Sequence, residues 1–364
     1  MPRILDALPA LYGNLFPSFF RREVPVEAKA TCSSCAMCES SCRNAAAPVD
    51  GISRMFRPDT KCCTFHPRLP NYLIGALLSD TDEALAEGQR RVRDKIANRA
   101  GVTPQWMRAP AKFDLLYKST RRAFGRAASL RCPYYDPGPG SCTIWRYREA
   151  VCSTFFCKYV SGADGHKLWM SIKTFLSLAE IQLSRYAVFR LYPEYIHDNR
   201  DRADAAERPL TLEELEDEGP PEEQYAAMWR GWAGMEPEFY QACFEEVRAL
   251  GEADLERLLG FDGTMEVAIL ERLYHAAVEP SLPKRLKLNP DATVNWLPDG
   301  TVALGAYSQY DAIGLPGEAY ALIAEFTGTE PVDAVRQRLR RQKQSDLADD
   351  VLLVLHQHRV LVEP

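Results

Sequence analysis

Several features that would assign this chain to a common functional class are missing from its sequence. The 364 residues include no run of about 18 apolar residues, so we expect no membrane-spanning segment. No G-x-G-x-x-G opens a helix after a strand and no P-loop lysine occurs, which leaves Rossmann and P-loop nucleotide chemistry unsupported. The C-x3-C-x2-C spacing of radical-SAM enzymes and a recognisable Ser/His/Asp arrangement are also absent.

A basic excess and a secretory leader are missing as well. The formal net charge is -6, whereas a nucleic-acid-binding domain carries a clear basic excess, so we expect no nucleic-acid partner. The first nine residues contain Asp6 and two prolines instead of an uninterrupted apolar stretch, so we expect no signal peptide. These absences predict a cytoplasmic, reducing environment in which thiols stay free.

Cysteine is what the sequence has in excess. Four of its eleven cysteines fall between Cys32 and Cys42 with the spacing C-x2-C-x2-C-x3-C. A cysteine buried for packing has no reason to recur every third position, whereas one tight loop can aim several thiolates at a single metal. The spacing equals that of the bacterial ferredoxin run, although Arg43 stands where proline normally follows the fourth cysteine. The match is therefore to ligand spacing.

The other cysteines form two further groups and one isolated member. Cys243 stands alone in a helical apolar pattern, where we expect it in the core. All ten others are candidate metal ligands, enough for two four-thiolate sites with two thiols left over. These candidates are Cys32, Cys35, Cys38, Cys42, Cys62, Cys63, Cys132, Cys142, Cys152 and Cys157.

A disulfide framework is the competing interpretation of these cysteines. It requires an oxidising compartment, and a chain of 364 residues can bury a core without disulfide bonds. We therefore predict a metal centre. Soft thiolates suit iron–sulfur clusters and zinc alike. One or two [4Fe–4S] clusters are favoured, because ten thiols exceed one zinc site, and zinc is the alternative.

Local patterns indicate how the later cysteines could meet. The turn Asp136-Pro-Gly-Pro-Gly folds the chain back, so Cys132 and Cys142 are expected to face each other across a hairpin-like loop. Cys152 and Cys157 lie five residues apart, so they converge only if the chain turns between them. These four cysteines, together with Cys62 and Cys63, are expected in one neighbourhood with the first motif.

Apolar periodicity predicts a mainly α fold with irregular cysteine-rich loops. Residues 4–20 are expected to dock onto the core, and Lys118 to Arg131 is expected to be helical with Phe124 and Leu130 facing inward. His66 is a second-tier candidate, either as a ligand or as an outer donor that orients one. Further helices are expected over residues 71–78, 81–99, 165–190 and 222–279, with an acidic linker over 200–224.

The last part of the chain has a pattern of its own. Residues 293–304 consist of two apolar runs around Asp299-Gly300, which predicts a β-hairpin. Helical patterns and a short apolar run follow over residues 317–326, 332–341, 347–358 and 360–362.

The cysteine order resembles the CxxCxxCC, or YkgJ-like, family, which is associated with zinc or iron chelation. The resemblance covers roughly residues 30–160, and flagellin lysine-N-methylases share a related pattern. The family usually closes its first motif with a cysteine pair, whereas Ser41-Cys42 stands there in this chain. The residues that carry the resemblance are Cys32, Cys35, Cys38, Cys62, Cys63, Cys132, Cys142-Thr-Ile-Trp145, Arg148 and Cys152.

The last 75 or so residues resemble a PqqD-like winged-helix module, a fold with which peptide-modifying enzymes hold leader peptides. A DNA-reading winged helix is the alternative, but the third helical stretch is acidic and apolar, which does not suit a groove lined with phosphates. The matching residues are Pro298-Asp-Gly300, Tyr320 to Gly328 and Asp349-Asp350-Val351.

These patterns predict three parts and two functional hypotheses. The first hypothesis is a protein that binds a metal through cysteine thiolates; the second is a metal-dependent enzyme that modifies a peptide or protein held by the C-terminal module, for example by methylation. The predicted parts are a cysteine-cluster metal-binding domain (1–200), a helical extension (201–284) and a PqqD-like winged-helix domain (285–364).

Overall fold

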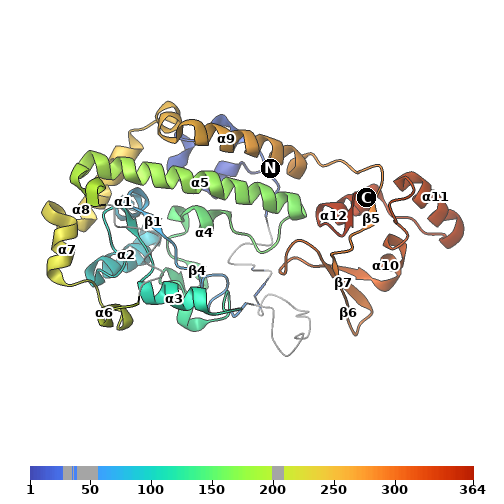
Figure 1. Cartoon of the computed structure of the whole chain (residues 1–364), viewed down its shortest axis with the longest axis horizontal. Coiled ribbons are helices and arrows are strands. Elements are labelled where there is room, and N and C mark those ends of the chain that lie inside the picture. The colour runs from blue at the N-terminus through green and yellow to red at the C-terminus, as the bar shows by residue number, and fades with distance from the viewer. Residues whose placement is uncertain (28–34, 36, 39–55, 199–208) are drawn as a thin grey trace.

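The computed structural model describes residues 1–27, 35, 37–38, 56–198 and 209–364. The described part of the chain is mainly helical, as the sequence predicts, with small antiparallel sheets (Figure 1). Its α-helices are α1 (Asn71–Ser79), α2 (Ala86–Asn98), α3 (Ala111–Ser119), α4 (Ala150–Thr154), α5 (Gly162–Leu191), α6 (Leu212–Leu215), α7 (Glu222–Trp229), α8 (Glu236–Arg248), α9 (Glu252–Val278), α10 (Gly317–Ile323), α11 (Val332–Lys343) and α12 (Asp349–Gln357).

Helix α5 is the longest element and forms the spine of the main body. It has 30 residues, and its buried side chains recur three or four positions apart, as at Leu168, Ile172 and Phe175. That spacing places them on one face of a helix. Helices α8 and α9 pack against α5, and α1 packs against α8 (Figure 1). The predicted long helix over 165–190 and the helices of 222–279 are thus confirmed.

The N-terminal segment docks onto this core in short 3-10 turns. The turns are η1 (Ile4–Ala7), η2 (Ala10–Gly13) and η3 (Ser18–Arg21). Pro9 and Pro17 directly precede the second and third turns, where the missing N–H and the ring of proline prevent one continuous helix. The expected docking of residues 4–20 is confirmed, because Phe16 and Phe20 are buried with their rings against Phe175.

The sequence prediction of a helix from Lys118 to Arg131 is wrong. Helix α3 ends at Ser119, and the chain continues through turns to the 3-10 turn η6 (Ala128–Leu130). Arg122 and Gly125 have φ angles of 59° and 73°, which a right-handed helix excludes. Leu130 is nevertheless buried, as expected, while Phe124 is half-buried.

The other boundary differences are smaller. The helix expected over 81–99 begins as α2 only at Ala86, after the 3-10 turn η5 (Glu83–Leu85). The acidic stretch 200–224 lies partly outside the described residues, and its described part contains α6 and the start of α7.

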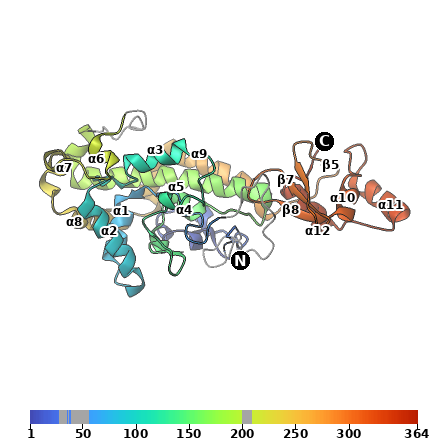
Figure 2. The ribbon, with the colours of Figure 1, turned by 90° about the horizontal axis from the view of Figure 1, so that it is seen from below.

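A second buried core lies in the C-terminal segment, at one end of the molecule (Figure 2). The predicted hairpin is confirmed around Gly300, whose φ of 82° suits a tight turn. Strands β6, β7 and β8 form one antiparallel sheet, while β5 and β9 pair near the two ends of the segment. This α+β module comprises α10 to α12 and the strands β5 (Lys287–Leu288), β6 (Thr293–Trp296), β7 (Thr301–Gly305), β8 (Ile313–Pro316) and β9 (Leu361–Val362).

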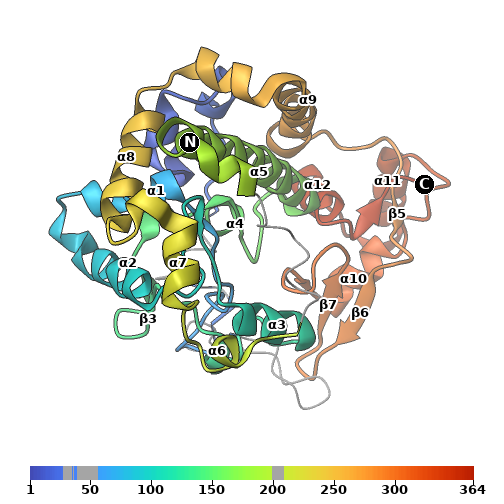
Figure 3. The ribbon, with the colours of Figure 1, turned by 60° about the vertical axis from the view of Figure 1, so that its left-hand side comes forward.

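Polar contacts attach this module to the start of α5. Asp311 accepts the Tyr159 N–H at 3.2 Å and lies 3.7 Å from Nε2 of His358. Arg359 pairs with Asp164 in the first turn of α5. Helix α12 accordingly lies beside the N-terminal end of α5 (Figure 3).

Candidate metal centre

Two of the four cysteines in the first motif lie in the described part of the chain. Cys35 and Cys38 are both buried, and the Cys38 N–H donates to the Cys35 carbonyl at 3.1 Å. A turn therefore brings these two residues close together. Cys32 and Cys42 lie outside the described residues.

A backbone hydrogen bond joins the adjacent pair Cys62 and Cys63 to the second cysteine segment, which runs from Cys132 to Cys157. The Cys132 N–H donates to the Cys63 carbonyl at 2.8 Å, which places these residues side by side. Strands β3 (Tyr135–Asp136) and β4 (Ser141–Cys142) then form a hairpin that sets Cys142 opposite Tyr135. The loop predicted from the Asp-Pro-Gly-Pro-Gly turn thus has the expected antiparallel form.

The pKa shifts of the thiols indicate which other cysteines lie near Cys132. Burial raises the pKa of Cys132 to about 12, and the charges of Cys142 and Cys62 add to the shift. Burial also raises the pKa of Cys152 in α4, with further contributions from Cys132 and Cys142. Because Coulomb interactions weaken with distance, these mutual effects indicate that the four side chains share one neighbourhood.

Cys62 links this group to the first motif. Burial raises the pKa of Cys35, and the charges of Cys62 and Cys38 raise it further. Cys157 is buried in a small cluster with Cys35 and Cys38, against which Cys62 packs. Helix α4 ends at Thr154, so the chain turns before Cys157 as the sequence analysis required.

The eight described candidate cysteines are therefore brought into one region. They come from the first motif, the adjacent pair, the hairpin and α4: Cys35, Cys38, Cys62, Cys63, Cys132, Cys142, Cys152 and Cys157. Cys243 is buried in the main core instead, as predicted.

Two cations influence the charge of the thiols. A hydrogen bond from Cys63 lowers the pKa of Cys62, and the charges of Arg148 and Lys61 lower it further. Arg148 lies over the ring of Trp145 at 3.4 Å and donates to the carbonyl of Cys152 at 2.9 Å, so its position is fixed. The surroundings of Cys62 consequently favour its anionic form.

Two buried carboxyl groups adjoin α4, and sequence reasoning missed both. Glu149 caps α4 by accepting the N–H groups of Val151 and Cys152 at 2.7 and 2.9 Å. Burial raises the pKa of Glu180 on α5, and the charge of Glu149 raises it further. The detectable signals were a carboxylate just before a short helix and a lone acid on an apolar helix face.

Both ring nitrogens of His66 have partners within the protein, which argues against a role as a metal ligand. Its Nδ1–H donates to the Pro67 carbonyl at 3.0 Å, and Nε2 lies 3.4 Å from the Nζ of Lys95. Burial lowers the pKa of the ring to about 3, so the imidazole is neutral at pH 7. It lines a pocket beside α2 and α3.

The donor chemistry of the region fits a soft metal, although no described set of ligands closes a site. Among residues 1–27, 35, 37–38, 56–198 and 209–364, no three His, Cys, Asp or Glu side chains are arranged to hold a metal ion. The thiols nevertheless match the ligand preference of iron–sulfur clusters and zinc. Two candidate ligands of the first motif, Cys32 and Cys42, lie outside that search.

Comparison with known proteins gives no further assignment. No family model, curated protein or solved structure matches this chain. The family resemblances stated from the cysteine order and the C-terminal motifs therefore stay predictions. In the part of the chain described, no helix combines the length and the apolar character needed to cross a membrane.

Proposed function

We propose that this protein binds a soft metal centre through cysteine thiolates, with one or two [4Fe–4S] clusters favoured and zinc as the alternative. The observation that carries the proposal is the position of Cys62, which packs against the cluster of Cys35, Cys38 and Cys157 and directly precedes Cys63, whose carbonyl accepts the Cys132 N–H. Residues nearly one hundred positions apart in sequence thus contribute thiols to one region. A metal would hold these segments together, because ligands from separate parts of a chain couple metal binding to folding.

The chain supplies both ligands and charge balance to such a centre. An iron–sulfur cluster would provide electron transfer or an open iron, whereas a closed zinc site would stabilise the fold. The guanidinium of Arg148 and the ammonium of Lys61 favour the anionic form of Cys62. Burial of Cys35, Cys38 and Cys157 limits the access of water.

The decisive experiment is anaerobic purification of the full chain with analysis of iron, zinc and acid-labile sulfide, together with a visible spectrum. We expect metal in the wild-type protein and less of it in Cys62→Ser. The matched control is Cys243→Ala, since Cys243 is buried in the main core and should leave the metal content unchanged.

Each outcome decides between the alternatives. A brown protein with iron and sulfide supports the cluster, and a colourless protein with stoichiometric zinc overturns the iron assignment. A folded protein without metal would contradict the proposal as a whole.

A second candidate function, modification of a peptide or protein, is favoured by a pocket of about 530 Å³. Its lining combines Arg122 and Arg126 of the body with residues of β6, β7 and the following loop. Tyr310, in that loop, packs against the cluster of Cys35, Cys38 and Cys157. The pocket therefore connects the C-terminal module with the cysteine region.

Two features of this pocket suit an extended acidic peptide. Strand β6 is at the edge of its sheet, where a further strand could pair with its free backbone groups. Among the described residues, the buried Nε of Arg126 has no hydrogen-bond partner, so its N–H could donate to a carboxylate of the peptide.

Deletion of residues 285–364 separates the two candidates. A displayed library of random peptides, screened against the full and the shortened chain, should yield binders only for the full chain if the module holds a substrate. Retained metal with lost peptide binding supports the enzyme. Equal peptide binding by both chains, or none by either, would leave metal binding as the function.

A further inference from the structure

A second pocket lies between α2, α3 and the residues on either side of Cys132. Its volume is about 520 Å³, within the range of small-molecule sites. The charged side chains in its lining are Arg90, Arg91, Lys95, Lys112, Asp94 and Asp217. Four cations against two carboxylates leave a net charge of +2 in the lining.

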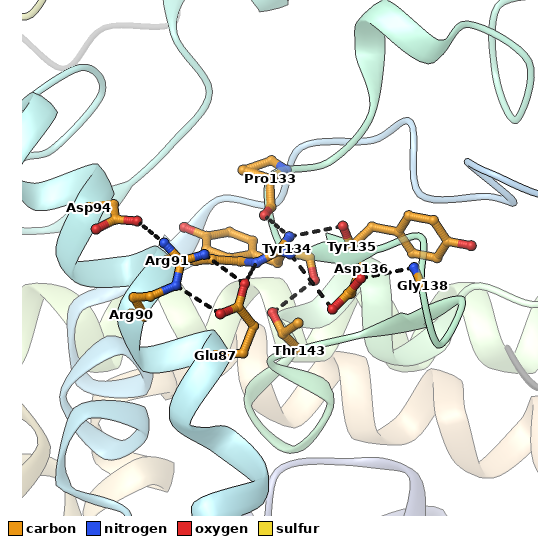
Figure 4. A network of polar contacts seen from close by, with 10 residues as sticks. All are labelled: Glu87, Arg90, Arg91, Asp94, Pro133, Tyr134, Tyr135, Asp136, Gly138 and Thr143. Carbon is orange, nitrogen blue, oxygen red and sulfur yellow. Dashed lines mark hydrogen bonds and ion pairs between the residues drawn. The ribbon is translucent and has the colours of Figure 1, made fainter.

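Two of these cations are already engaged by carboxylates. Arg90 donates to Glu87 at 2.8 and 2.7 Å and to Asp94 at 2.5 Å (Figure 4). Lys112 pairs with Asp217 at 2.8 Å. Neither side chain therefore has its charge available for a ligand.

Arg91 is engaged as well, and it serves as a clamp between α2 and the hairpin. It donates to Glu87 at 2.6 Å and to the carbonyls of Pro133 and Tyr135 at 2.7 and 2.9 Å (Figure 4). These contacts hold one wall of the pocket in place.

Lys95 differs from these three cations. Its Nζ donates to the Ala100 carbonyl at 3.1 Å and lies 3.4 Å from Nε2 of the neutral His66. Across the described ranges, no carboxylate lies within ion-pair distance of Lys95, and no hydrogen bond joins it to Asp114 or Cys132. Its ammonium is half-buried and its hydrogen-bond partners are neutral, while the carboxylate of Asp114 acts on it only from beyond ion-pair distance, so an incoming anion would stabilise it.

The opposite wall is apolar and exposed. Helix α3 has no buried residue, although it carries Phe113 and Leu116. Both line the pocket, and Leu116 is 42% exposed. Leu130 lies deeper in the same lining and is buried. An apolar ligand body would cover this wall and remove its surface from water.

We propose that this pocket binds an organic monocarboxylic acid, with its carboxylate on Lys95 and its apolar body against Phe113 and Leu116. A single ammonium without a direct ion pair among the described residues suits one negative charge, because the guanidinium groups that would grip a polyphosphate are occupied by Glu87 and Asp94. The site lies next to the cysteine region, since Pro133 of its lining directly follows Cys132, but Lys95, Phe113 and Leu116 are not candidate metal ligands.

The test is titration calorimetry of the full-length protein with benzoate, hexanoate, benzamide and inorganic phosphate. Benzoate or hexanoate should bind. Benzamide, which has no charge, and inorganic phosphate, which has no apolar body, should bind at least about tenfold more weakly. Lys95→Met should weaken benzoate binding about ten- to one-hundredfold, since it removes a charged hydrogen bond. Lys112→Met is the matched control, because Lys112 is already paired with Asp217.

A second variant keeps the proposal testable if Lys95→Met does not fold. Leu116→Glu changes an exposed residue and places a negative charge on the wall, so it should weaken benzoate while leaving thermal unfolding unchanged. Equal binding of benzamide and benzoate, unchanged affinity in a folded Lys95→Met, or no binding of either acid would each overturn the proposal.

Discussion

Glu27 shows how one residue can make the junction between body and module depend on pH. Its carboxylate accepts the Val160 N–H at 2.8 Å and the Trp169 Nε1–H at 3.2 Å. Burial raises its pKa from 4.5 to about 7, and the charge of Asp311 contributes to the shift. Asp311 itself binds the loop before α5, so two carboxyl groups meet at this junction.

The sign of the resulting pH effect follows from proton linkage. Between about pH 4.5 and pH 7 the folded chain holds a proton on Glu27 that the unfolded chain releases, so this group's contribution to stability falls as the pH rises. Glu27→Gln should remove that part of the pH dependence and raise stability above pH 7, because a neutral amide avoids the cost of a buried charge while its oxygen still accepts one of the two hydrogen bonds.

Urea unfolding near pH 5 and near pH 8 measures this effect in both proteins. The free energy of unfolding should differ less between the two pH values in Glu27→Gln than in the wild type. An unchanged difference would show that Glu27 titrates normally in the folded state.

At the scale of the elements, helices α1 and α8 pack so closely at Gly75 that no side chain fits between them. A Cβ built on Gly75 would lie 1.8 Å from the Tyr240 carbonyl oxygen, which is backbone and cannot rotate away. Tyr240 is itself fixed, because its hydroxyl donates to the Thr103 carbonyl at 2.7 Å. The two helices can approach this closely only because residue 75 has no side chain.

Gly75→Ala should therefore push α1 and α8 apart and lower the free energy of unfolding by about 2–3 kcal/mol. Urea unfolding followed by far-UV circular dichroism provides the measurement. Gly13→Ala is the control: nothing lies within 4 Å of its added Cβ, and the loss should stay within about 0.5 kcal/mol. Similar losses in both variants would disprove the steric argument.

At the scale of the whole molecule, the attachment of the C-terminal module depends on the start of α5. Gly162 has a φ of 55°, and a Cβ there would lie 2.6 Å from the backbone oxygen of Gln357 at the end of α12. Any side chain at this position would separate α12 from α5, although Arg359 and Asp164 pair nearby.

Gly162→Ala should loosen the module from the body and increase the radius of gyration in small-angle X-ray scattering. The matched control is Gly260→Ala, which has a φ of 56° but nothing within 4 Å of the added Cβ. Both variants should lose about 1–2 kcal/mol from the positive φ, and only Gly162→Ala should change shape. Expansion of both, or of neither, would contradict the contact with α12.

Periodicity in the sequence was enough to predict the long helices and the C-terminal hairpin. The recurrence of Leu168, Ile172 and Phe175 places them on one helix face, and Asp299-Gly300 provides the turn that joins two strands. These are local preferences, set by spacing and turn chemistry. They fail where the backbone leaves the helical region without a proline, as at Arg122 and Gly125 between α3 and η6.

Only the tertiary structure decided which cysteines meet. The sequence predicted one neighbourhood for the later cysteines and the first motif, but it did not assign the individual contacts: Cys62 packs against Cys35 and Cys38, and Cys63 bonds through its carbonyl to Cys132. The same holds for Lys95, whose sequence context is a charged helix face, yet whose ammonium faces a pocket formed by α2 and α3. Contacts between distant segments depend on how helices pack, and the packing of α1, α5 and α8 is a property of the whole chain.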